Sequence, residues 1–436
     1  MANTYLTKTL GTPTNNKRWT FSAWVKKAHT GGDINTLFGA GGDSSNIGLI
    51  WVNYSNGMIQ FHSQTSGGLT GGSVRLLSKL RDVAAWYHIV VSFDSANSTA
   101  ADRVKIYING IRGTNFDGTP DYPNLNIASF INSNIAHTVG KDPHRSAGYY
   151  DGSASHIHFI DGTVYAASSF GSTDSTTGEW TINTGPNVTY GNNGFAILKD
   201  GNTITDQSPN SNNFSLGSGA VTTIKDCPAT NFATMNPLFA GDANITYSNG
   251  NLKTTAANAS QKNAVSTIAV SSGKWYCEMV SRNGTNYPGY GIMDSQSVLQ
   301  SSVSYLGSSS DSYCMFQDGN YYTNGSASST GTTWGVGSIM GVAIDLDSST
   351  KTIKFFKNGS QTHSATIATP ANAYVFAVSH NTNGTITEIN FGNGFFGTTA
   401  ITTNSGNGYA GAEGKSKFNY QPPSGYSALN TKGLNQ

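Results

Sequence analysis

Apolar residues recur at every second position in short runs, and this period of two is the feature that most constrains the fold. In RVKIYING (103–110), Val104, Ile106 and Ile108 point to one side of an extended chain and the residues between them to the other. The segments 19–26 and 86–94 show similar apolar runs, and Gly-, Asn-, Asp- and Ser-rich clusters separate such runs. Long helical periodicity is almost absent, so the pattern predicts an all-β chain.

Asn-Gly pairs follow two of the alternating segments. Asn109-Gly110 and Asn358-Gly359 provide the positive φ angles that tight two-residue hairpin turns need. Both pairs therefore predict hairpins and an antiparallel arrangement of the strands.

The chain of 436 residues is long enough for two β-sandwich domains, each with its own core. The alternation weakens between 168 and 240, but this stretch keeps aromatic residues that favour an ordered connector. Pro422-Pro423 excludes helix at that point of the C-terminal segment. We predict two antiparallel β-sandwich (jelly-roll) domains joined by an ordered, loop-rich connector, with the boundaries 1–167, 168–240, 241–395 and a Gly- and aromatic-rich tail at 396–436.

Charged residues make up 11% of the chain, against about 25% in ordinary soluble proteins. The 25 basic and 24 acidic side chains leave a formal charge of +1, which argues against nucleic-acid partners and against a polybasic membrane patch. The N-terminal MANTYLTKTL has no apolar core of a signal peptide, and we expect neither classical secretion nor membrane insertion. Neutral surfaces or sugars are the expected partners.

The three cysteines are Cys227, Cys277 and Cys314, an odd number at wide spacing. This spacing provides neither a disulfide framework nor a paired metal motif. A disulfide between Cys277 and Cys314 is geometrically possible. We nevertheless expect reduced thiols, as in a protein assembled in a reducing cytoplasm.

Four segments of the first half resemble the concanavalin A-like, laminin-G-type jelly roll: FSAWVKK (21–27), WYHIVVSFDS (86–95), RVKIYINGIR (103–112) and YYDGSASHIHFIDG (149–162). The second half resembles a SPRY domain through GKWYCEM (273–279), GYGIMD (289–294) and the hairpin GVAIDLDSSTKTIKFFKNG (341–359). The resemblance implies two binding domains.

The connector and the tail resemble bacteriophage tail and virion-associated proteins, through FGSTDSTTGEW (170–180), DCPATNFATMNPL (226–238) and QPPSGYSAL (421–429). This resemblance implies a phage virion structural protein, a tail or head fibre or appendage for host attachment, located in the virion and assembled in the host cytoplasm. Its implied partners are other virion proteins and a host surface glycan or protein, with a homo-oligomer, for example a trimer, as the assembled form. The alternatives are a capsid or tail cementing protein, a polysaccharide depolymerase and a cellular SPRY-type adaptor.

Glycoside hydrolases share the concanavalin-like fold, so an enzyme has to be considered. Retaining glycosidases need two carboxylates about 5 Å apart, which acids at i and i+4 of one strand face would provide. The glutamates are Glu179, Glu278, Glu388 and Glu413, and none has an acid at that spacing. Asp345 and Asp347 share a face but fit turn-flanking acids. We predict no enzymatic activity.

Calcium is the cofactor that the laminin-G resemblance implies, with Asp33, Asp43, Asp142 and Asp151 as candidate ligands. The alternative is that these residues stabilise turns. His156 and His158 would project from one side of a strand, with Ile157 and Phe159 towards the core; without a third ligand they indicate a polar outer face.

Two sets of aromatic and polar residues are candidate binding sites. The SPRY resemblance points to loops at one end of the second domain, where Tyr and Asn suit recognition; the alternative is packing at strand edges. The candidates there are Tyr287, Tyr290, Asp318, Asn320, Tyr321 and Tyr322. In the first domain Trp51 and Tyr54, with His62, are candidates for a platform under a sugar ring; the alternative is burial of Trp51 in the core.

Overall fold

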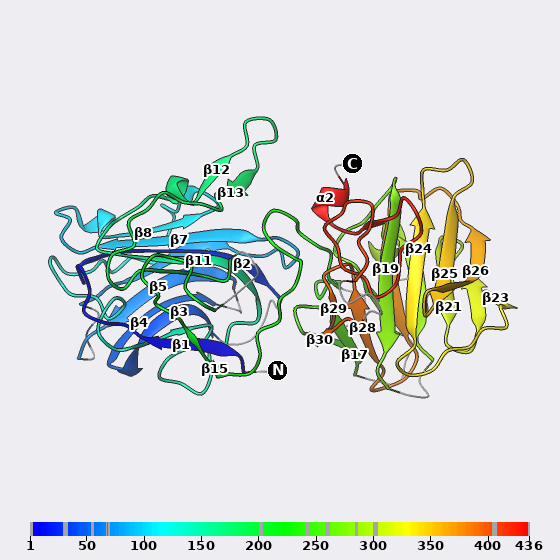
Figure 1. The fold of residues 1–436 in the computed structure, drawn as a ribbon, viewed down its shortest axis with the longest axis horizontal. Coiled ribbons are helices and arrows are strands. Elements are labelled where there is room, and N and C mark those ends of the chain that lie inside the picture. Colours follow the sequence, from blue (N-terminus) through cyan, green and yellow to red (C-terminus); the bar gives the residue numbers. More distant parts are fainter. Residues whose placement is uncertain are drawn as a thin grey trace. The chain divides into compact units, whose positions relative to one another are not determined.

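The computed structural model describes residues 3–28, 34–53, 56–66, 68, 70–199, 204–239, 244–257, 262–283, 287–299, 304–402 and 408–434. The chain divides into two compact units, Met1–Thr223 and Ile224–Gln436 (Figure 1). Antiparallel strands dominate both units, which confirms the predicted all-β class. The helices of the described residues are short: η1 (Ala100–Asp102), η2 (Ala167–Ser169), α1 (Ser295–Leu299) and α2 (Thr431–Leu434).

Unit 1 is built on two sheets. The β1 sheet has the order β15 (Ser215–Ser218), β1 (Tyr5–Thr9), β10 (Ala136–Val139), β3 (Ile34–Asp43), β4 (Asn46–Asn53), β5 (Met58–Gln64) and β6 (Ser73–Lys79). The β2 sheet has the order β14 (Phe195–Ile197), β11 (Gly152–Asp161), β2 (Arg18–Lys27), β7 (Tyr87–Asp94), β8 (Val104–Ile108) and β9 (Ile111–Arg112).

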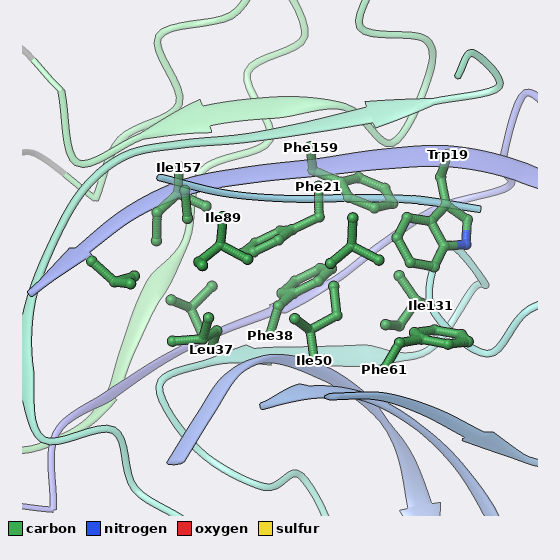
Figure 2. Packing of buried hydrophobic residues seen from close by; sticks show 14 of the residues in the cluster. Trp19, Phe21, Leu37, Phe38, Ile50, Phe61, Ile89, Ile131, Ile157 and Phe159 are labelled. Atoms are coloured by element: carbon green, nitrogen blue, oxygen red, sulfur yellow. The ribbon is translucent and has the colours of Figure 1, made fainter. Parts of the chain in front are cut away.

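Aromatic side chains from both sheets form the core of unit 1 (Figure 2). Trp19 stacks on Phe93 with ring centroids 5.3 Å apart, and Phe21 of β2 stacks on Phe38 of β3 at 5.4 Å. Each of these side chains is fully buried, which contributes on the order of 2 kcal/mol per side chain to stability. The two sheets therefore pack face to face, as the alternation predicts.

The predicted hairpin turns are present in both units. Asn109 and Gly110 have φ angles of 47° and 81°, and they join β8 to β9 with Ile108 opposite Ile111. Asn358 and Gly359 have φ angles of 49° and 84°. These positive angles are those of the two-residue turn that matches the twist of the strands.

A third layer covers the outer face of the β2 sheet. It includes the hairpin of β12 (Gly171–Thr173) and β13 (Trp180–Ile182). Trp180 Nε1 donates a 3.0 Å hydrogen bond to Nδ1 of His88, whose ring lies between Trp24 and Trp180 at centroid distances of 4.9 and 5.9 Å. Aromatic residues of the predicted connector are thus ordered within unit 1; Phe170, Phe195 and Phe214 are buried.

Unit 2 also has two sheets. The β19 sheet has the order β16 (Ile245–Ser248), β17 (Lys253–Ala256), β28 (Ile386–Asn390), β19 (Lys274–Ser281), β24 (Ile339–Asp345), β25 (Thr352–Lys357) and β26 (Ser360–Thr366), with β31 (Ser427–Ala428) parallel to β19. The β20 sheet has the order β18 (Lys262–Val265), β27 (Tyr374–His380), β20 (Gly289–Asp294), β21 (Ser312–Phe316), β22 (Asn320–Thr323) and β23 (Ser326–Ser329). A small hairpin pairs β29 (Phe395–Phe396) with β30 (Thr399–Ala400).

The C-terminal tail packs on the outer face of the β19 sheet through a buried carboxylate. Glu278 is fully buried and accepts hydrogen bonds of 2.8 Å from the backbone N–H groups of Asn419 and Tyr420. The amide of Asn390 and the hydroxyl of Tyr276 also donate to it, at 3.2 and 3.4 Å. Burial raises the pKa of Glu278 to about 7, while these hydrogen bonds act in the opposite direction. The tail is therefore an integral part of unit 2.

The cysteines are free thiols: Cys277 and Cys314 are buried on strands of different sheets, and Cys227 is half-buried. Burial raises the pKa of all three thiols. Among the described residues, no helix is long and apolar enough to span a membrane.

Buried histidines should make unit 1 more acid-sensitive than unit 2. Burial lowers the pKa of His88 and His158 to about 3 and of His137 to about 4 in unit 1, and of His380 in unit 2 to about 3. An unfolded histidine titrates near 6.5, so the unfolded state binds more protons and stability falls as the pH drops below that value. At pH 5 the loss is roughly 2 kcal/mol per histidine.

Hydrogen exchange across a urea series at pH 7.5 and pH 5 measures this effect for each unit separately. We expect the histidines to lower the free energy of unfolding by roughly 6 kcal/mol in unit 1 and roughly 2 kcal/mol in unit 2, where the raised pKa of Glu278 acts in the opposite direction and makes the net loss smaller still. Equal losses in the two units would contradict the assignment.

Glu278→Gln should destabilise unit 2 by roughly 2 to 3 kcal/mol. The introduced amide group places an N–H₂ donor against backbone donors of Asn419 and Tyr420, so at least one buried donor loses its acceptor. Denaturant unfolding, with hydrogen exchange in the tail, measures the loss. Glu179→Gln is the control, because Glu179 is exposed on the hairpin of unit 1; similar small effects of both substitutions would argue against the role of Glu278.

Candidate functional site

Four residues on neighbouring strands of the β1 sheet stand opposite one another. Thr36 of β3 pairs with Trp51 of β4, Trp51 with Gln60 of β5, and Gln60 with Arg75 of β6. Residues that are directly opposite in an antiparallel sheet project from the same face. The alternate residues of these strands, such as Ile50, belong to the core, so the four side chains form a row on the outer face, which we call the Trp51 row.

The row is polar on either side of the indole, and only Trp51 and Arg75 are partly exposed. Trp51 is half-buried and Gln60 is 9% exposed. Nε2 of Gln60 donates a 3.0 Å hydrogen bond to Oγ of Ser73. Arg75 forms a 2.5 Å ion pair with Asp117, and the two side chains are 37% and 34% exposed. An aromatic ring and planar polar groups are thus fixed on one rigid sheet.

His62 lies beside the row on β5. Its ring centroid is 6.4 Å from that of Trp51, and its Nδ1 lies 3.5 Å from Oγ of Ser73. Burial lowers the pKa of His62 below its usual value, which leaves the ring neutral at pH 7. His62 therefore adds a polar group and no charge to the surface.

The β3 end of the row lies under a loop. Thr36 is fully buried, and its N–H donates a 3.2 Å hydrogen bond to the carbonyl of Gly148. Gly148 in turn lies against Asp142, which is buried. The row is therefore closed at Thr36 and open to solvent at Arg75.

Trp51 lies on this outer face. The alternative interpretation of the sequence, burial of Trp51 in the core, is therefore wrong. Tyr54, its predicted partner, lies outside the described residues. The predicted calcium ligand Asp33 also lies outside them.

The other three predicted calcium ligands have hydrogen-bond roles in turns and loops. Asp43 is exposed and accepts from the N–H of Ser45 at 2.8 Å. The buried Asp142 accepts from Nδ1 and the backbone N–H of His144 at 3.0 and 3.1 Å. Asp151 donates its N–H to Oδ1 of Asn35 at 3.0 Å, and its carbonyl accepts from the N–H of Ala28 at 3.1 Å. No group of three or more His, Cys, Asp or Glu side chains that could hold a metal ion occurs in the described part of the chain, and calcium stays a prediction.

His156 and His158 do not form a continuous outer row, because a bulge interrupts β11 between Ser155 and His158. His156 has a φ of 48°, and Nδ1 of His158 lies 2.9 Å from the hydroxyl of Tyr190 in the covering layer. The predicted core residues Ile157 and Phe159 are in the core.

In unit 2, two of the predicted binding tyrosines are buried. Tyr290 is 1% exposed and Tyr321 is 6% exposed, and both belong to the core between the sheets. Tyr322 is half-buried with its ring 5.2 Å from that of Phe316. Buried side chains do not contact a ligand, so we do not place Tyr290 and Tyr321 at a binding surface.

The remaining candidates of unit 2 lie at loops. Tyr287 is 49% exposed. Asp318 is exposed and accepts hydrogen bonds of 3.0 and 2.9 Å from the N–H and the side-chain amide of the half-buried Asn320. Gly289 is opposite Phe316, and the N–H of Gln317 donates to the carbonyl of Pro288 at 3.1 Å, so Tyr287 and Asp318 lie at the same end of the β20 sheet. Tyr290 and Tyr321 are not part of that surface.

Two glutamates come near each other across β19 and β28, a pairing that spacing along one strand does not reveal. Glu278 is opposite Asn390 and Glu388 is opposite Val280, so the two acids are diagonal neighbours. Both are buried; Glu278 binds the tail, and Glu388 forms a 2.6 Å ion pair with Arg282. Neither acid is placed to reach a polysaccharide.

Family comparisons match two separate parts of the chain. Residues 2–168 match the model of the concanavalin A-like lectin/glucanases superfamily, and residues 275–394 match the model of the SPRY domain. The chain has a laminin-G-like domain and a SPRY domain. Together with the β-sheet architecture, these matches indicate a carbohydrate- or protein-binding protein.

No curated protein sequence matches the chain. Among solved structures, the SPRY domain of human HERC1 is 18% identical, with 36% of this chain and 96% of that chain covered and a TM-score of 0.30. Stonustoxin is 15% identical, with 56% and 34% covered and a TM-score of 0.29. A heptameric SAP-like pentraxin from Limulus polyphemus is 15% identical, with 37% and 71% covered and a TM-score of 0.27.

Gln60, Arg75 and Asp117 of the laminin-G-like domain were not predicted from the sequence. The alternation in MIQFHSQ and SVRLLSK indicates which residues share a face within each strand. Only the register between strands places them beside Trp51.

Proposed function

We propose that the protein is a non-enzymatic glycan-binding protein and that the Trp51 row is its contact surface. A pyranose ring has a face of C–H groups and a rim of hydroxyls. A partly exposed indole can stack on the C–H face, and planar amide and guanidinium groups can form hydrogen bonds with the hydroxyls. The observation that carries the proposal is the alignment of Trp51, Gln60 and Arg75 on one face of a sheet.

A rigid sheet favours this surface over a loop site. The backbone beneath the three side chains is fixed by ladder hydrogen bonds, and the core packs against its inner face. A preorganised surface loses little conformational freedom when a ligand binds. The family match supports the same class of ligand, since lectins are part of the matched superfamily's description.

We further propose that the protein is displayed in several copies on a bacteriophage virion and attaches it to a host surface glycan. The support is the resemblance of the connector and tail motifs to phage virion proteins. Cementing of virion subunits is the alternative. Adsorption of the purified protein to candidate host cells, with their extracted polysaccharides as competitors, tests the attachment role; saturable adsorption that the polysaccharides do not reduce would contradict it.

Trp51→Ala should reduce glycan affinity about ten- to a hundred-fold, because the ring that contacts the sugar face is removed. Binding is measured by calorimetry with a polysaccharide that the wild-type protein selects from a panel. Trp51→Phe should retain most of the affinity, since it keeps an aromatic face. Trp180→Ala is the matched control on the opposite side of the domain.

The same incubations should release no reducing sugar. Release by the wild-type protein would contradict the non-enzymatic role, and full binding by Trp51→Ala would contradict the proposed surface. Circular dichroism and hydrogen exchange of β4 establish that each variant is folded.

A further inference from the structure

We infer that the Arg75–Asp117 ion pair, together with Gln60, recognises the hydroxyl groups of the ligand, and that the ligand is an uncharged glycan with neighbouring hydroxyls. This inference rests on the proposed function and names the class of glycan. It concerns the part of the outer face that lies beyond the indole, towards the β6 edge of the β1 sheet.

The geometry places the ion pair within reach of a sugar stacked on Trp51. Gln60 separates Trp51 from Arg75 by two strand spacings, which amount to about 10 Å. A ring on the indole, or the next ring of an oligosaccharide, therefore lies beside the guanidinium and the carboxylate. Both of these side chains keep about a third of their surface exposed.

The hydrogen-bonding groups at this end favour hydroxyls over anions. Nε of Arg75 is buried, so the Nη groups are its donors towards a ligand, and Asp117 provides acceptors directly beside them. Because Nε2 of Gln60, which is only 9% exposed, already donates to Ser73, the group that this side chain offers to a ligand is its acceptor Oε1. A hydroxyl both donates and accepts, so a pair of hydroxyls matches this set. A carboxylate or sulfate only accepts and would be repelled by Asp117 and by Oε1.

The local charge agrees with an uncharged ligand. Asp117 balances the charge of Arg75, and His62 is neutral at pH 7. Lys79 also lies on β6, but it stands opposite Met58 and not opposite a residue of the row. An acidic sugar would have to displace Asp117 from Arg75, and the short charge-assisted hydrogen bond between these two side chains would be lost.

The position of Asp117 is fixed by the backbone around it. Its N–H donates a 3.0 Å hydrogen bond to the carbonyl of Arg75, and Phe116 and Asp121 form bridges with β6. The segment around Asp117 therefore extends the sheet beyond β6. The carboxylate is held in place before a ligand arrives, as a specific site requires.

The test compares two matched ion pairs with two classes of polysaccharide. The probes are neutral glucan, mannan and galactan, and the uronic-acid polymers alginate and polygalacturonate. The variants are Arg75→Gln and Asp117→Asn. The controls are Arg112→Gln and Asp102→Asn, because Arg112 and Asp102 form a 2.9 Å pair of nearly the same exposure elsewhere in the domain.

We expect the wild-type protein to bind a neutral polymer with an affinity that changes less than twofold between 50 and 500 mM NaCl. Arg75→Gln and Asp117→Asn should each weaken binding at least tenfold, and the control variants should not. Selection of the uronic-acid polymers, with an affinity that falls as salt rises, would overturn the inference.

The outcomes also separate this inference from the proposed function. If Trp51→Ala loses binding while Arg75→Gln and Asp117→Asn keep it, the surface is right and the role of the ion pair is wrong. If Trp51→Ala binds as well as the wild type, or if no polysaccharide binds, both are wrong. Urea unfolding of each variant shows whether a loss of binding reflects a loss of folding.

Discussion

Buried carboxylates that accept backbone N–H groups hold the long loops of this chain to its sheets. In unit 1, Asp161 at the end of β11 is 1% exposed and accepts from the N–H groups of Thr14, Asn15 and Asn193 at 2.6, 3.1 and 3.0 Å. In unit 2, Glu278 has the same role for the C-terminal tail. Since an unpaired buried N–H group costs as much as a lost hydrogen bond, each carboxylate allows irregular backbone to be buried.

A third buried acid of unit 2 has the same role as Asp161 and Glu278. Glu413 resembles Glu278, because it is buried and accepts from the N–H groups of Ser416 and Ala428 at 3.0 and 2.9 Å. Such acids join segments that are distant in sequence, and their oxygens are already occupied. The carboxylate that remains half-exposed beside the Trp51 row is Asp117, and it is paired with Arg75.

The fold was predictable because its signals are local. Alternation within single strands indicates the core face, and Asn-Gly pairs indicate the turns at 109–110 and 358–359. The candidate site was predictable only in part: Trp51 was recognised as an aromatic candidate, but its face depends on the pairing of β3, β4 and β5. For Tyr290 and Tyr321 the sequence predicted a binding role, but both are buried. A tyrosine suits a core and a binding surface equally well, and only the position of the second sheet decides between them.

The Trp51 row lies on one face of a sheet, and this geometry bears on how it can act. A surface of this kind covers less of a ligand than a deep cleft, so a single copy is expected to bind a sugar with modest affinity. Several copies fixed on one particle face the same polysaccharide, and after the first contact the others bind at a high effective concentration. The proposed contact is rigid and has no net charge, which suits the proposed display in many copies: repetition would supply its strength, and its affinity would depend little on ionic strength.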